Sequence, residues 1–156
     1  MKRLLVFAMV VALTLAASSL LLAQANPFVG TWKLNSAKSK YTSGAPLKEG
    51  TITVQMVDDQ DQVTVNETAA DGSPISLKYE LPDKGGAGKI LAGTYDAVSG
   101  RWIDDNIRET SMIKGGKEIG NARSVVSKDG KTMSITNKGK DTQGKPVSRV
   151  TIWEKQ

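Results

Sequence analysis

Arginines in strand-forming segments are the side chains of this sequence best suited to recognise a ligand. Arg123 and Arg149 lie in such segments, and an inward guanidinium costs free energy unless a carboxylate, a phosphate or a ligand meets it. Arg123 shares a pleat face with Ile119 and Val125, which favours an inward direction and makes it a candidate to line a cavity. Arg108 shares its face with one polar and one apolar neighbour, which leaves its direction open. The alternative for each is an outward arginine on a solvated face.

Aromatic side chains with polar tips form the second group of candidates. Their rings suit the apolar part of an amphipathic ligand, and their hydroxyl or indole groups can orient it. The alternative is that these rings only fill the interior, which small barrels commonly allow. The candidate cavity-lining residues are Trp32, Tyr79, Tyr95, Trp102, Arg123, Arg149 and Trp153.

Several kinds of chemistry are excluded by composition. The chain has no histidine and no cysteine, which excludes Ser-His-Asp and Cys-His catalysis, disulfides and the usual zinc sites. Asp59 and Asp61 alternate like calcium ligands, but the glycine and the distant glutamate of an EF-hand loop are missing, so we expect a solvated hairpin there. We expect no enzyme activity, no metal and no cofactor. An enzyme using carboxylates or hydroxyls in a barrel mouth is a third interpretation.

Alternating apolar and polar residues predict the strands that must position these side chains. Ile52, Val54 and Met56 alternate with polar residues, and residues 75–81 do the same, so each segment has one dry and one wet face. Residues 36–46 show no strand pattern, and we expect a short helical turn or a loop there. Further β-rich segments cover residues 63–65, 107–113, 118–127, 132–137 and 147–154.

The connections between these segments determine the fold class. They are short and rich in Gly, Asp and Lys, which leaves no room for crossover helices, so sequential strands should pair antiparallel. We predict an all-β, up-and-down meander of about eight to ten strands, closed into a barrel because closure removes exposed edges. A two-sheet sandwich is the alternative. With 5% aromatic and 24% charged residues, the composition does not suit an outer-membrane barrel.

The first 25 residues have the pattern of an export signal. A basic start, Met1-Lys2-Arg3, precedes an apolar stretch over residues 4–22 and the A-x-A site Ala23-Gln24-Ala25. We predict cleavage after Ala25, a single domain over residues 26–156, and a bacterial periplasmic or secreted protein that does not span a membrane once mature. The alternative is an uncleaved membrane anchor.

The distribution of charge bears on partners. Lys2 and Arg3 contribute two of the net five positive charges of the chain, so the predicted mature domain is only weakly basic and we expect no nucleic-acid partner. From residue 114 onward basic residues predominate, which is compatible with weak contact to an anionic envelope surface. The alternative role for these lysines is solubility and the blocking of edge pairing. They are Lys114, Lys117, Lys128, Lys131, Lys138, Lys140 and Lys145.

Both ends of the predicted domain resemble lipocalins and fatty-acid-binding proteins. Gly30-Thr31-Trp32 resembles the Gly-x-Trp of their first strand, and the final Trp153-Glu154-Lys155 is similar to the end of the fatty-acid-binding proteins. The run of residues 122–139 resembles the second half of small secreted bacterial lipocalin-like domains. The resemblance implies a closed barrel, a small-molecule ligand, and a late basic residue that packs over the first-strand tryptophan.

One departure concerns the ligand carboxylate. Fatty-acid-binding proteins carry an arginine two residues before the terminal aromatic, where this chain has Thr151. Arg149 lies one pleat further back, roughly 7 Å away, so the carboxylate-binding role is not carried over. We expect Arg149 to close the barrel over Trp32, with a ligand contact as the alternative.

The leading interpretation is a soluble, monomeric, lipocalin-like barrel that binds a small apolar or amphipathic molecule without transforming it. The alternative is a structural or interaction module of the bacterial envelope, with a plugged barrel and no ligand.

Overall fold

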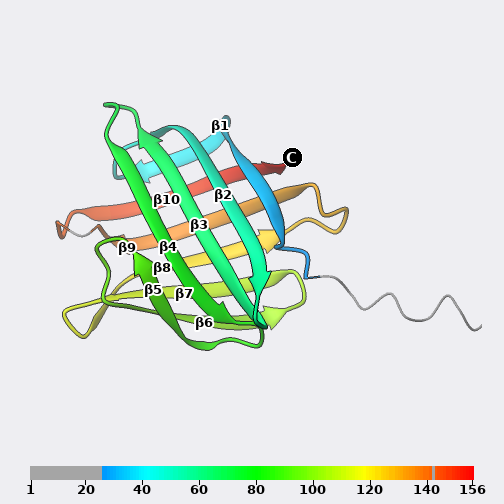
Figure 1. Ribbon diagram of the computed structural model, residues 1–156. Helices are drawn as coiled ribbons and strands as arrows, with labels where there is room; N and C mark the ends of the chain where they lie inside the picture. Colours follow the sequence, from blue (N-terminus) through cyan, green and yellow to red (C-terminus); the bar gives the residue numbers. More distant parts are fainter. Residues whose placement is uncertain (1–25, 142) are drawn as a thin grey trace, which may run out of the picture.

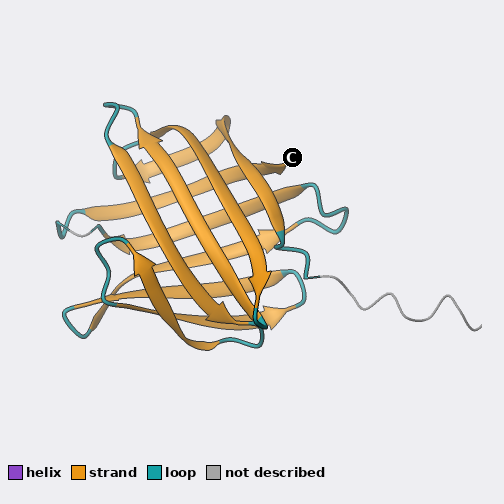
Figure 2. Ribbon diagram, viewed as in Figure 1, coloured by secondary structure: helices purple, strands orange, loops and turns teal. Residues whose placement is uncertain are grey.

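The computed structural model describes residues 26–141 and 143–156, which form one antiparallel barrel (Figure 1). Each strand pairs with its neighbours in sequence, and the first strand pairs with the last. The predicted up-and-down all-β meander and its closure are therefore confirmed (Figure 2). The strands are β1 (Gly30–Ser43), β2 (Leu47–Val57), β3 (Gln60–Ala69), β4 (Pro74–Pro82), β5 (Gly86–Ala92), β6 (Ala97–Asp104), β7 (Ile107–Lys114), β8 (Lys117–Val126), β9 (Thr132–Lys140) and β10 (Pro146–Lys155).

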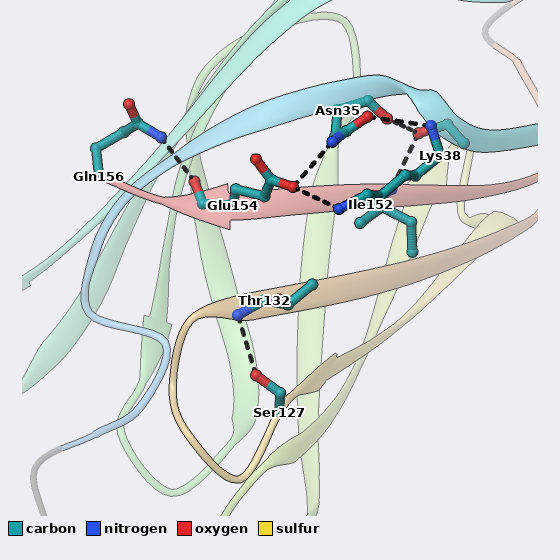
Figure 3. Close-up of polar contacts among 8 residues, drawn as sticks. Asn35, Lys38, Ser127, Thr132, Ile152, Glu154 and Gln156 are labelled. Atoms are coloured by element: carbon teal, nitrogen blue, oxygen red, sulfur yellow. Dashed lines mark hydrogen bonds and ion pairs between the residues drawn. The ribbon is translucent and has the colours of Figure 1, made fainter.

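The seam between β1 and β10 closes the barrel. Its register places Trp32 opposite Lys155. On the outer side of the seam, Glu154 Oε1 accepts hydrogen bonds from Asn35 Nδ2 at 2.8 Å and from Lys38 Nζ at 3.0 Å (Figure 3). Because the Lys38 and Glu154 side chains are largely exposed, this ion pair adds little stability. The backbone ladder itself therefore holds the seam together.

Residues 36–43 belong to β1, contrary to the expected helical turn or loop. The register of the seam shifts between Asn35 and Lys40. At the shift, Ser39 Oγ accepts a hydrogen bond from the Ile152 amide at 3.0 Å and donates one to the Asn35 carbonyl at 2.8 Å. A bulge of this kind interrupts the two-residue alternation on which strand prediction depends, so the second half of β1 was missed.

Strands β5 and β6 also carry no clear signal in the sequence. The two strands pair only from Gly86 to Gly88, and glycine has no side chain to contribute to an alternating pattern. The packing around Leu81 favours a residue without a side chain at position 100, because a Cβ on Gly100 would lie 3.0 Å from the Leu81 side chain.

A dense apolar core fills one end of the barrel, which we call the Phe28 end. Phe28 and Trp32 are fully buried there, and the Trp32 Nε1 donates a hydrogen bond to the Phe28 carbonyl at 2.8 Å. The segment that precedes β1 is thereby fixed across this end. The other buried members of the core are Ile52, Val54, Val63, Tyr79, Leu81, Val98, Val126, Met133, Ile135 and Trp153.

The expected export signal, residues 1–25, and its cleavage after Ala25 lie outside the described residues. In the part of the chain that the structure describes, no helix is long and apolar enough to cross a membrane.

Candidate functional site

The interior of the barrel is packed unevenly from one end to the other. On five strands, the two inward residues nearest the Phe28 end are buried, and the next inward residue is only partly buried. We call this second level the Arg149 end. On these five strands solvent therefore reaches inward-facing side chains at the Arg149 end, whereas on β2 and β3 Leu47, Glu67 and Ala69 are buried there. The partly exposed residues of this level are Leu77, Met112, Ala122, Asn137 and Arg149.

An ion pair lies inside the Arg149 end. Arg149 Nη2 is 3.1 Å from Glu67 Oε2, and its Nε donates to Asn137 Oδ1 at 3.4 Å. Only 17% of the Arg149 side chain and 6% of the Glu67 side chain are exposed. Burial raises the pKa of Glu67, and Arg149 opposes this effect. The charge of this inward arginine is thus met by a carboxylate of the protein itself.

Tyr95 joins this pair from the turn between β5 and β6. Burial raises the pKa of its phenol, with Arg149 lowering it and both Asp141 and Glu67 raising it. Tyr95 thus lies within electrostatic range of both members of the pair.

Tyr41 adds a polar group that the sequence analysis did not single out. It lies opposite Arg149 in the β1–β10 ladder, and directly paired residues project from the same face of a sheet. Its hydroxyl oxygen is buried and has no hydrogen-bond partner. Buried polar groups nearly always have a partner, so this hydroxyl is a candidate ligand contact. Tyr41 was not identified from the sequence because it lies in the second half of β1, which was not predicted as a strand.

A second, more deeply buried ion pair lies at the Phe28 end. Arg108 Nη1 is 2.6 Å from Asp61 Oδ2, and Asn26 Nδ2 donates to Asp61 Oδ1 at 2.9 Å. Burial raises the pKa of Asp61 despite Arg108. The guanidinium carbon of Arg108 also lies 4.7 Å from the centre of the Phe28 ring. Asp61 is thus an interior residue, contrary to the expected solvated hairpin.

Four of the predicted cavity-lining aromatics lie at the Phe28 end. Trp32, Tyr79 and Trp153 are buried in the packed core, and burial raises the pKa of the Tyr79 phenol. Trp102 packs edge-on against the Phe28 ring, with centroids 5.1 Å apart. Trp32, Tyr79 and Trp102 are separated from Arg149 along the barrel axis, whereas the Trp153 ring extends to Gly50, which pairs with Glu67.

The cation over Trp32 is Lys155 and not Arg149. Lys155 Nζ lies 4.9 Å from the centre of the Trp32 ring, as the pairing of these two residues in the seam requires. Arg149 pairs instead with Tyr41, near the other end of β1. The expectation that Arg149 closes the barrel over Trp32 is therefore corrected by the register of the seam.

Arg123 lies on the outer face of the barrel, contrary to the inward direction that its pleat neighbours favour. Its Nη1 is 2.7 Å from Glu109 Oε1, and Arg101 Nη2 is 2.6 Å from Glu109 Oε2. The hydrogen bonds from Arg101 and Arg123 lower the pKa of Glu109. The inward residues of β8 are the small Ala122 and Ser124, so hydrophobicity does not identify the inner face of this strand.

Comparison with known proteins gives no family for this chain, so its function has to be inferred from its own residues. No protein-family model matches the chain, and no curated protein matches it significantly.

Proposed function

We propose that this protein is a lipocalin-like barrel that binds a small apolar or amphipathic molecule at the Arg149 end and does not transform it. The observation that carries the proposal is that on β4, β7 and β8 the inward residues are partly exposed at that end and buried at the other. Leu77, Met112 and Ala122 offer apolar surface there. A few polar groups among apolar side chains are the usual composition of a small-molecule site.

Binding without catalysis is favoured by the positions of the interior carboxylates. Asp61 and Glu67 are each held by an arginine, and they lie at opposite ends of the barrel. General acid–base chemistry on one substrate needs its groups within reach of the same atoms.

Export and membership of the lipocalin superfamily are part of the same proposal. We infer a signal over residues 1–25, a monomeric mature domain in the periplasm or outside the cell, and weak attraction to anionic envelope surfaces. Support for the family comes from Trp32, which opens β1, is buried and has a lysine over its ring. A cation over an aromatic face is a favourable contact.

The second candidate function is a structural module of the envelope with no ligand. The dense packing of the Phe28 end favours it, because that end is filled by the protein's own side chains. The two functions differ in whether the Arg149 end accepts a molecule.

Titration with the uncharged fluorescent probe N-phenyl-1-naphthylamine tests the proposal. We expect saturable binding to the wild type and loss of binding in Leu77→Trp, because the larger ring would block the part of the Arg149 end that Leu77 borders. The matched control is Ser76→Trp on the same strand, whose side chain is exposed and which should bind like the wild type. Absence of probe binding to the wild type would favour the structural module.

A further inference from the structure

We propose that the Arg149 end selects uncharged amphiphiles and rejects anionic ones, and that the Tyr41 hydroxyl binds the polar head. This inference rests on the proposed function and adds the chemical class of the ligand.

The selection against anions follows from the Glu67–Arg149 pair. Both side chains face the interior and are largely buried, so their charges cancel within the site. An anionic head would have to displace Glu67 from Arg149, leaving a buried carboxylate without its partner. It would also lose its own hydration. A neutral head avoids both costs.

The hydrogen bond for a neutral head is supplied by Tyr41. Its buried hydroxyl has no partner, and it lies in the ladder directly opposite Arg149. A hydroxyl can donate or accept, so an alcohol or a carbonyl group would satisfy it. The apolar chain of such a ligand would contact Leu77, Met112 and Ala122, which complete the same level of the barrel.

Two competitors with the same ten-carbon chain test the head group. Decan-1-ol below its solubility limit and decyl sulfate below its critical micelle concentration are used to displace N-phenyl-1-naphthylamine at neutral pH. In the wild type we expect decan-1-ol to bind at least about tenfold more tightly, since an uncompensated charge in the interior costs at least 1.4 kcal/mol, or one factor of ten.

Glu67→Gln should reverse the selection. It leaves Arg149 without a carboxylate, so decyl sulfate should bind at least about tenfold more tightly than to the wild type, while decan-1-ol changes little. Glu109→Gln is the matched control, because it also frees two arginines, Arg101 and Arg123, but on the outer face. This control should leave both affinities unchanged.

Tyr41→Phe tests the hydrogen bond separately. It should weaken decan-1-ol by about two- to tenfold, the range for one hydrogen bond, without changing the affinity for the probe. A neutral double variant, Glu67→Gln with Arg149→Gln, provides a form without a buried charge if Glu67→Gln fails to fold, and it should still prefer decan-1-ol.

Each outcome separates this inference from the proposed function. If the probe does not bind to the wild type, the proposed function fails and this inference fails with it. If the probe binds, but decyl sulfate competes with the wild type as well as decan-1-ol does, the selection is overturned and the proposed function stands. An unchanged decan-1-ol affinity in Tyr41→Phe overturns the role of Tyr41.

Discussion

Arg108 reaches Asp61 across the Phe28 end of the barrel, with 2.6 Å between its Nη1 and Asp61 Oδ2, although the two residues are 47 positions apart in the sequence. The side chains are 5% and 1% exposed. Arg108 Nε has no hydrogen-bond partner of its own. This buried pair, placed against the rings of Phe28 and Trp102, links the segment before β1 to the middle of the chain.

Breaking this pair from one side should destabilise the barrel strongly. Arg108→Met leaves the Asp61 carboxylate buried without a cation, so we expect the free energy of unfolding to fall by about 3–5 kcal/mol. Replacing both partners, with Asp61→Leu and Arg108→Met, should restore much of the loss. Urea unfolding measures both, and Arg101→Met on the outer face is the control, with a change within about 1 kcal/mol. A double variant no more stable than Arg108→Met would contradict the prediction.

Truncation of Arg149 should cost far more stability than truncation of Arg123. Arg149→Ala leaves Glu67 buried and unpaired, so we expect a loss of about 3 kcal/mol or more in the free energy of unfolding. Arg123→Ala removes a partner of Glu109 at a side chain that is 42% exposed, and a loss of at most about 1 kcal/mol is expected. Thermal or urea unfolding of the two variants compares them directly. Equal losses would mean that Glu67 does not depend on Arg149.

Trp32→Ala should test the core of the Phe28 end. The ring is fully buried, and its removal also eliminates the hydrogen bond to the Phe28 carbonyl and the contact with Lys155. We expect the free energy of unfolding to fall by about 3–5 kcal/mol. Urea unfolding gives the value, and Lys155→Met, which keeps the apolar stem over the ring, should cost far less. A midpoint near that of the wild type in Trp32→Ala would contradict the burial of this ring.

Acidification should have the same effect on anion binding as Glu67→Gln. Burial raises the pKa of Glu67 above its ordinary 4.5, so the group takes up its proton as pH falls, starting above that value, and Arg149 is then uncompensated. The other ionisable groups near the site are Tyr41, Tyr95 and Asp141. Decyl sulfate keeps its charge throughout, and its affinity for the wild type should rise as the pH falls from 7 toward 4.5.

Glu67→Gln is the control for this pH dependence. Its affinity for decyl sulfate should be high and nearly constant over the same range, because the titrating group is gone. A parallel rise in both proteins would instead indicate a general increase in positive charge on the surface.

The fold class was accessible from sequence because alternation is a local property. Ile52 and Val54 both project into the barrel, because successive side chains of a strand point to opposite faces. The turns are so short that sequential strands can pair only antiparallel. The exceptions have local causes. The bulge after Asn35 and the glycines around β5 remove the alternation itself, so a strand forms there without its usual signal.

The absence of histidine and cysteine, the strand pattern and the first-strand tryptophan are properties of the sequence alone, and they determined the fold class and the excluded chemistry. The partners of the arginines were decided only by the tertiary structure. Arg149 and Glu67 lie 82 positions apart, and the register of the closed barrel brings them together. The register of β8 likewise places Arg123 on the outer face of the barrel. Which residues face each other across a barrel depends on the register of every strand pair that lies between them. No local sequence pattern specifies all of these registers together.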